Sequence, residues 1–242
     1  MTEEHINKLL TIRRARVPRI VAEKAALLVI DMQEYQVSRG FALYESLNTL
    51  TPGLLDYYLE RVSTLVEPNL KRLLPAGRRA GVKIVYTQYS SFDQDGRDLI
   101  RQNQAANRAA QKFFGGVVFP PLDHPGSKII PSLAPRPEDI VVVKNTSGVF
   151  TSTRLEFILR NLGLEQALIA GVVTNMCVEN AARIASDLGF DTFIIGDACA
   201  AWSRESHDSS LRSFEMVFGS VLTTDQVLEQ LNEKPGGGAA GQ

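Results

Sequence analysis

The sequence predicts an α/β protein in which a parallel sheet lies between two layers of helices, and three observations support this. Apolar runs of strand length, most of them rich in β-branched residues, recur along the chain, which is typical of strands buried on both faces. Segments with helical spacing of apolar residues alternate with these runs. The alternation continues over six strands, which favours a three-layer α/β/α arrangement.

Two of the predicted strands end on a charged residue. The apolar run 25–31 stops on the carboxylate of Asp31, and the run 140–144 stops on the amine of Lys144. Between them, strand two follows Gly81, a residue type that commonly ends helices. The full set of predicted strands is 25–31, 82–88, 140–144, 166–171, 192–196 and about 217–222.

Helices are predicted between the strands. In segment 59–79, apolar residues recur at helical spacing, and Pro68 and Pro75 are expected to bend or split the helix. Thr153 and Glu156 match a capping box that opens a helix over 154–162. Further helices are predicted at 99–114, 177–188, 204–216 and from Thr224.

The chain of 242 residues fits one α/β domain with a sizeable core. We expect an N-terminal arm over 1–24, a single domain over 25–232 and a flexible glycine-rich tail over 233–242. The long connections 34–58 and 89–135 are expected to be ordered and to line a site.

Composition excludes several classes of protein. The net charge of −1 gives no field that would attract nucleic acid or a membrane. The longest apolar runs fall short of a membrane span, and the N-terminus shows no secretory signal. Two cysteines make no disulfide framework, so a reducing, cytoplasmic location is expected.

Cys177 is the first candidate for chemistry. It follows an apolar run that ends at Gly171, and it opens an alanine-rich helical pattern. A helix N-terminus favours an anion, so a cysteine there is expected to have a lowered pKa and thiolate character. A buried cysteine that only packs at the helix start is the alternative. Cys199, which lacks such a helix start, is interpreted as a small buried side chain.

Asp31 and Lys144 are expected to join Cys177. The carboxyl ends of parallel strands share one edge of the sheet, where ligands bind in open α/β folds. An acid, an amine and a thiol that converge there supply a proton acceptor, a cation and a nucleophile.

With these residues, the chain resembles the isochorismatase-like cysteine hydrolases, a family that includes nicotinamidases, N-carbamoylsarcosine amidase, biuret and ureidoacrylate amidohydrolases, and isochorismatases. The resemblance covers about residues 25–231. It rests on Leu28-Val-Ile-Asp-Met-Gln33, on Val143-Lys144 with Phe150 six residues later, on Gly171-Val-Val-Thr-Asn-Met-Cys-Val178 and on Asp197-Ala-Cys-Ala-Ala201.

The resemblance implies a six-stranded sheet of order 3-2-1-4-5-6 and a catalytic triad of Asp31, Lys144 and Cys177. It also implies a non-proline cis peptide, expected between Val173 and Thr174, and an oxyanion hole made by the backbone N–H groups of Thr174 and Cys177. A homo-oligomer, dimer or tetramer, is expected from the resemblance and from the aromatic-rich connections.

The expected function is hydrolysis of a non-peptide C–N bond in a small linear amide, ureido or carbamoyl compound, with a thioester-like intermediate on Cys177. The resembled family commonly has Lys-x-Arg-Tyr-Ser at the lysine, whereas this chain has Thr146 in place of the arginine that could hold a substrate carboxylate. The resemblance therefore favours compact neutral substrates. Strand-end and loop residues are candidates for substrate binding: Gln33, Tyr35, Gln88, Tyr89, Asn145, Phe150 and Val173.

Two other functions stay open. An isochorismatase-type enol-ether hydrolase would need Asp31 without the thiol, and a non-catalytic member of the family would only bind a ligand. No cofactor is expected. The three histidines form no metal-ligand pattern, and Asp56 is followed by Tyr57 and Tyr58 where metal-binding nicotinamidases have Asp-x-His, so no metal site is expected.

Overall fold

The computed structural model describes residues 3–14 and 17–232. Its centre is a six-stranded sheet of order β3-β2-β1-β4-β5-β6, and every neighbouring pair is parallel. The predicted fold class and strand order are therefore confirmed. The strands are β1 (Ala25–Ile30), β2 (Lys83–Tyr89), β3 (Ile140–Lys144), β4 (Gln166–Val172), β5 (Asp191–Ala200) and β6 (Ser220–Leu222).

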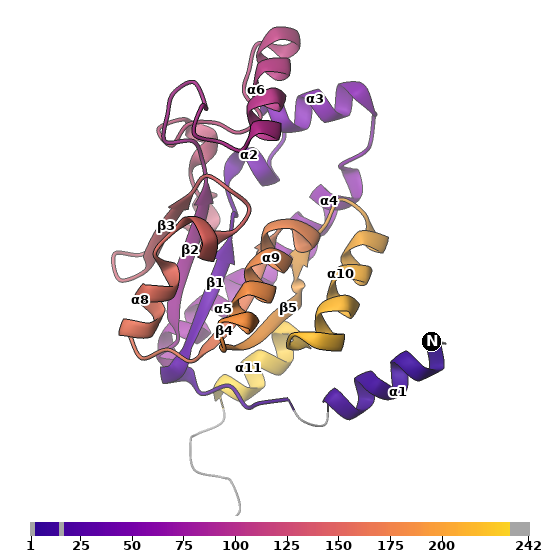
Figure 1. Ribbon diagram of the computed structural model, residues 1–242, viewed down its shortest axis with the longest axis vertical. Helices are drawn as coiled ribbons and strands as arrows, with labels where there is room; N and C mark the ends of the chain where they lie inside the picture. Colours follow the sequence, from indigo (N-terminus) through magenta and orange to yellow (C-terminus); the bar gives the residue numbers. More distant parts are fainter. Residues whose placement is uncertain (1–2, 15–16, 233–242) are drawn as a thin grey trace, which may run out of the picture.

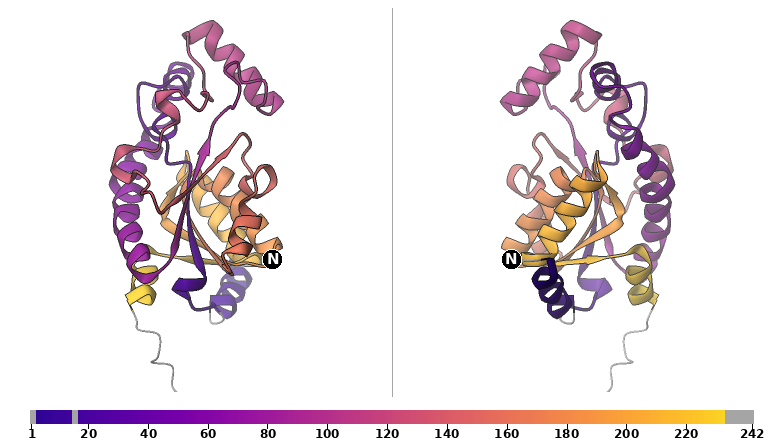
Figure 2. Two further views of the ribbon diagram at one scale, coloured as in Figure 1. Left: turned by 90° about the vertical axis from the view of Figure 1, so that its left-hand side faces the viewer. Right: turned by 90° about the vertical axis from the view of Figure 1, so that its right-hand side faces the viewer.

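Helices cover both faces of the sheet (Figure 2). One face is covered by α4 (Asp56–Arg61), the π-helical turn η2 (Val62–Val66), α5 (Glu67–Ala80) and α11 (Thr224–Asn232). The other face is covered by α7 (Val149–Ser152), α8 (Leu155–Asn161), α9 (Glu179–Asp187) and α10 (Arg204–Val217).

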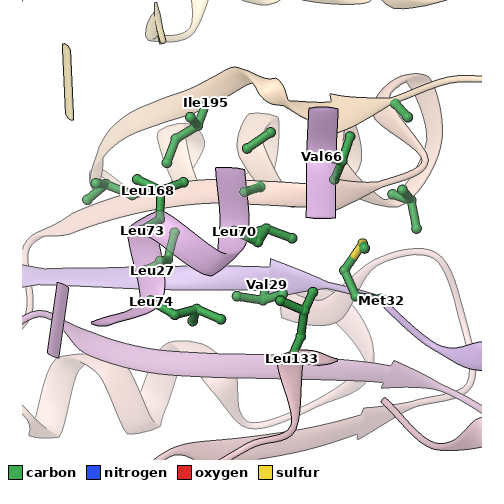
Figure 3. Packing of buried hydrophobic residues seen from close by; sticks show 14 of the residues in the cluster. Leu27, Val29, Met32, Val66, Leu70, Leu73, Leu74, Leu133, Leu168 and Ile195 are labelled. Carbon is green, nitrogen blue, oxygen red and sulfur yellow. The ribbon is translucent and has the colours of Figure 1, made fainter. Parts of the chain in front are cut away.

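The core has two halves because successive strand residues point to opposite faces of the sheet. From β1, Leu27 and Val29 pack toward α5 (Figure 3), whereas Ala26, Leu28 and Ile30 pack toward the other helical layer. Both sets are almost completely buried, as expected for a strand covered on both sides.

The predicted helix 59–79 is longer at its start and is divided. It begins at Asp56, passes through the π-helical turn η2 and continues as α5, in which Pro68 lies in the first turn. Because proline has no N–H to donate, it is tolerated in the first turn of a helix. Strand β6 is shorter than predicted, because α10 extends to Val217.

The two long connections are ordered and lie beyond the carboxyl ends of the strands (Figure 1). The first contains α2 (Glu34–Val37) and α3 (Ala42–Leu50), and the second contains α6 (Arg101–Phe114) with the 3-10 turns η3 (Pro125–Ser127) and η4 (Pro131–Leu133). They therefore enclose the edge at which a ligand is expected.

The N-terminal arm contains α1 (Glu3–Arg14) and the 3-10 turn η1 (Ala22–Lys24). Arg14 donates two hydrogen bonds of 2.7 Å to Glu215, which tie α1 to α10. The predicted tail, 233–242, lies outside the described residues. Among the helices within 3–14 and 17–232, none combines the length and apolarity that crossing a membrane requires.

Candidate active site

Three strand ends position the predicted catalytic residues. Asp31 follows β1, Lys144 is the last residue of β3, and Cys177 lies in the π-helical turn η5 (Thr174–Val178) between β4 and α9. Strand β2 separates β1 from β3, so the long side chain of Lys144 is needed to reach Asp31. On the way, its Nζ lies 4.3 Å from the centroid of the Tyr89 ring at the end of β2, a cation–π contact.

The three groups meet at Lys144 Nζ. This atom lies 2.7 Å from Asp31 Oδ2, 3.4 Å from Cys177 Sγ and 3.2 Å from the carbonyl oxygen of Thr146. A lysine ammonium has three N–H donors, so each donor is directed at one of these acceptors. The other carboxylate oxygen of Asp31 accepts a 2.6 Å hydrogen bond from Thr87.

Burial sets the resting protonation state of Cys177. The pKa of its thiol is raised to about 12, first by burial; the positive charge of Lys144 opposes this rise, and Asp31 adds to it. The shift is therefore opposite in direction to the expected lowering of the pKa, because loss of solvation outweighs the helix start and the ammonium. For Lys144, burial lowers the pKa, but the charges of Asp31 and Cys177 outweigh burial, so the net shift is upward.

A cavity of about 300 Å³ opens beside Cys177. Its lining includes the aromatic rings of Tyr89, Phe119 and Trp202 and the carboxamides of Gln36, Gln102 and Asn103. These residues come from α2, β2, α6 and the connections, so the cavity is closed mainly by the two excursions beyond the sheet.

Two of the seven predicted substrate-binding residues, Tyr89 and Val173, line this cavity. The other five are held in internal contacts. Gln33 is completely buried and uses its amide to bond the backbone of Tyr89 and Ser127. The hydroxyl of Tyr35 donates to the backbone oxygen of Tyr89, and the amide of Gln88 donates to the backbone oxygen of Ser127. The amide of Asn145 donates to Asp98, and the ring of Phe150 packs against the ring of Phe190.

The sequence reasoning missed most of the cavity wall. Phe119 and Asn103 stand at no strand end, and Trp202 lies just beyond the motif segment that ends at Ala201, so the packing of α6 and of the segment after β5 was needed to find them. The one available signal was the concentration of aromatic residues in the long connections.

The predicted cis peptide is displaced by one residue. It lies between Val172 and Val173, where β4 ends, and not between Val173 and Thr174. Val173 lines the cavity. The side chain of Thr174 instead bonds the imidazole of His207, with 2.8 Å between Oγ1 and Nδ1.

His207 joins the turn η5, which carries Cys177, to two other elements. Its Nε2 lies 2.9 Å from Arg61 Nη2, and a guanidinium can only donate. Nε2 must therefore accept, so the neutral ring carries its proton on Nδ1 and donates it to Thr174. Arg61 also donates to the carbonyl oxygen of Cys199 at 2.8 Å, which links α4, β5, α10 and the turn that carries Cys177.

Cys199 lies inside β5, not after it as expected, because β5 extends to Ala200. It is completely buried, and burial raises its pKa to about 12. Within the described residues, no group of three or more His, Cys, Asp or Glu side chains is placed to hold a metal ion.

Comparisons with known proteins place these features in a family. The model of the isochorismatase domain matches residues 25–226. An uncharacterised isochorismatase family protein of Bacillus subtilis, YwoC, is 31% identical over 209 residues, which cover 86% of this chain and 95% of that protein. The ureidoacrylate amidohydrolase RutB of Acinetobacter baylyi is 26% identical over 220 residues, covering 85% and 82% of the two chains.

Among solved structures, a cysteine hydrolase from Pseudomonas syringae pv. phaseolicola aligns with a TM-score of 0.71 at 24% identity. The alignment covers 88% of this chain and 95% of that chain. At this identity the match shows the shared fold.

Proposed function

The chain belongs to the isochorismatase family of hydrolases, and we propose that it is a cysteine-dependent amidohydrolase. It would cleave a non-peptide C–N bond of a small linear amide, ureido or carbamoyl compound. The observation that carries this proposal is the contact of one buried ammonium, Lys144 Nζ, with both Asp31 and Cys177. That contact lies beside a cavity that Cys177 lines.

The first half of the reaction forms the covalent intermediate. Cys177 Sγ attacks the carbonyl carbon while its proton passes to the carboxylate of Asp31. A resting thiol, as the raised pKa of Cys177 implies, fits this step because the proton needs a base within reach. Asp31 then gives the proton to the departing nitrogen, the C–N bond breaks and an amine or ammonia leaves.

The second half regenerates the enzyme. Asp31, again a carboxylate, takes a proton from water as the water attacks the thioester-like carbon. Collapse of the tetrahedral intermediate breaks the C–S bond, and the proton returns from Asp31 to the sulfur. Throughout, Lys144 stabilises whichever partner is negative, because it contacts both.

The negative oxygen of each tetrahedral intermediate needs donors. We propose the backbone N–H groups of Cys177 and Thr174, with that of Val173 as an alternative to Thr174, since Val173 lines the cavity. One such donor typically stabilises a transition state by about 2.7–4 kcal/mol.

Replacement of the nucleophile tests the proposal. Cys177→Ala should abolish ammonia release from a panel of small amides and ureas, and mass spectrometry of the parent protein should detect an acyl adduct on Cys177. Cys199→Ala is the matched control, because it removes the other buried thiol and should leave turnover in place. Retained turnover in Cys177→Ala would rule out the covalent route.

The two alternatives give different results in the same assays. An enol-ether hydrolase that uses Asp31 would release no ammonia, and its cleavage of an enol ether would survive alkylation of Cys177 and fail on replacement of Asp31. A protein that only binds would release no ammonia from any substrate.

We also propose a cytoplasmic homo-oligomer, dimer or tetramer. The reducing cytoplasm would keep Cys177 as a free thiol. Exposed apolar side chains on the excursions, among them Phe92, Phe113 and Leu50, support association. Light scattering of the purified protein measures the subunit number directly.

A further inference from the structure

The cavity beside Cys177 is lined without formal charge. The residues that line it, all within the described range 17–232, include no Asp, Glu, Lys, Arg or His. A charged substrate group in contact with this lining would therefore lose water without gaining an opposite charge, which is unfavourable.

The ammonium of Lys144, which contacts Cys177 at the cavity, already has an acceptor for every donor. Each of the three N–H donors of Lys144 has an acceptor, namely Asp31, Thr146 O and Cys177. A substrate carboxylate would have to displace Asp31 from the ammonium, and this would remove the base that the proposed reaction needs.

Apolar groups form much of the remaining wall. The rings of Tyr89 and Phe119 pack with their centroids 5.3 Å apart, and Trp202 adds a third aromatic surface. Met176 and Ile100 also line the cavity, and these residues are 39% and 42% exposed. Apolar surface left open at a cavity favours a ligand that covers it with apolar atoms.

The polar part of the lining consists of neutral side chains that both donate and accept. Gln36 donates one amide hydrogen to the hydroxyl of Tyr35, and Asn103 donates one to the hydroxyl of Tyr89. Within residues 3–14 and 17–232, no partner takes the second N–H or the carbonyl oxygen of either carboxamide. Such groups match a neutral amide or urea and do not neutralise a carboxylate.

From this lining we infer the substrate class of the site: an uncharged primary amide or urea whose other end is an aryl or short alkyl group. The inference rests on the proposed function and narrows it. The cavity of about 300 Å³ lies at the small end of the range for ligand pockets, so the other end of the substrate must be compact. Carboxylate-bearing amides and N-carbamoyl amino acids are excluded by charge, although some are small enough to enter.

The test compares substrates that differ in charge at constant shape. Succinamide and succinamate differ only in NH2 against O⁻ at the remote end, and succinamide should have a kcat/KM at least 100-fold higher, since the unpaired charge is buried. Pentanamide and benzamide should exceed succinamide, and phenylurea should exceed N-carbamoylglycine. Succinamate turned over as well as succinamide would overturn the inference, as would acetamide matching benzamide.

A cation introduced at the cavity should reverse part of this preference. Gln102 lies near the start of α6, is exposed and lines the cavity, so Gln102→Arg supplies the missing charge without disturbing the core. The ratio of kcat/KM for succinamate over succinamide should rise about tenfold or more. Gln111→Arg is the matched control, because it adds the same charge to an exposed position of α6 outside the cavity and should leave the ratio unchanged.

Binding separates failure of this inference from failure of the proposed function. In Cys177→Ala, calorimetric titration should detect benzamide or pentanamide and a much weaker interaction with succinamate. If this pattern is found while the parent protein hydrolyses none of the compounds, the substrate class stands and the amidohydrolase proposal fails. Tighter binding of succinamate than of succinamide would contradict the substrate class in either case.

Discussion

The ammonium of Lys144 lies 2.7 Å from the carboxylate of Asp31, and neither side chain is exposed to solvent. The two residues end strands that are not neighbours in the sheet, since β2 lies between β1 and β3. Separate removal of either charge would leave the other buried without its partner. The pair should therefore behave as one unit in stability as well as in activity.

Lys144→Met tests whether the charges of Asp31 and Lys144 depend on each other. The variant leaves the Asp31 carboxylate buried and unpaired, which should lower the free energy of unfolding by about 3–5 kcal/mol. Turnover should fall by about 100-fold or more, because the ammonium that contacts both the proposed base and the proposed nucleophile would be gone. Urea denaturation and ammonia release measure the two effects.

The double variant Asp31→Asn with Lys144→Met separates stability from catalysis. It removes both charges, so much of the lost stability should return while activity stays absent. If the double variant is as unstable as the sum of the two single variants, the pair is not energetically coupled.

The sequence was sufficient to predict that Asp31, Lys144 and Cys177 meet, because each of them directly follows or ends a recognisable element. Asp31 and Lys144 terminate apolar strands, and Cys177 precedes an alanine-rich helix. Parallel strands place such residues at one edge of the sheet, so local pattern and general topology were enough to bring them together.

The cavity wall and the protonation state depended on packing between distant segments. Gln33 resembles a ligand-binding side chain in the sequence, yet its amide is consumed by the backbone at residues 89 and 127. Burial of the Cys177 sulfur raises its pKa. This burial depends on how the two long connections fold over the edge of the sheet, which the local sequence around Cys177 does not reveal.

The pH dependence of thiol alkylation shows whether the pKa of Cys177 is raised or lowered. With a pKa of about 12, the thiolate fraction of Cys177 rises about tenfold for each pH unit between pH 7 and pH 10. Because the thiolate is the form that reacts, the rate of alkylation by iodoacetamide should rise by the same factor. Cys199→Ala isolates the signal. A rate that is flat from pH 6 to pH 9 would mean that the resting sulfur is a thiolate.

The same alkylation assay tests whether the ammonium of Lys144 lowers the pKa of Cys177. Lys144 lowers the pKa of Cys177 against the effect of burial, so alkylation of Lys144→Met should be slower than that of the parent across this range. Equal rates would show that the ammonium does not act on the sulfur.

His207 should make the fold sensitive to acid. Burial, and then the charge of Arg61, lower its pKa to about 4, whereas an unfolded histidine titrates near pH 6.5. As the pH falls below 6.5, the unfolded chain binds a proton that the folded chain does not. The stability present above pH 6.5 is therefore lost as the pH falls toward 4, by on the order of 2–3 kcal/mol.

His207→Asn keeps an N–H group near Thr174 and cannot titrate. Urea unfolding at pH 7.5, 5.5 and 4.5 should show a shallower loss of stability in this variant than in the parent protein. Parallel pH profiles would show that His207 is not responsible for the acid sensitivity.

Gly171 fixes the backbone that carries Asp31. It has a φ of +113°, and a Cβ atom at this position would lie 2.2 Å from the carbonyl oxygen of Ile30, the residue before Asp31. Gly171→Ala must therefore push β1 and β4 apart beside the ion pair of Asp31 and Lys144. Gly163→Ala is the matched control, because Gly163 also has a positive φ but has no atom within 4 Å of the added Cβ.

The control should cost about 1 kcal/mol, the usual penalty for a side chain in the left-handed region, and should keep full turnover. Gly171→Ala should lose several times more stability and nearly all ammonia release, measured by urea denaturation and by initial rates. Equal behaviour of the two variants would show that the close approach to Ile30 does not constrain the site. If only Gly171→Ala loses stability and turnover, the position of Asp31 depends on a residue that does not line the cavity.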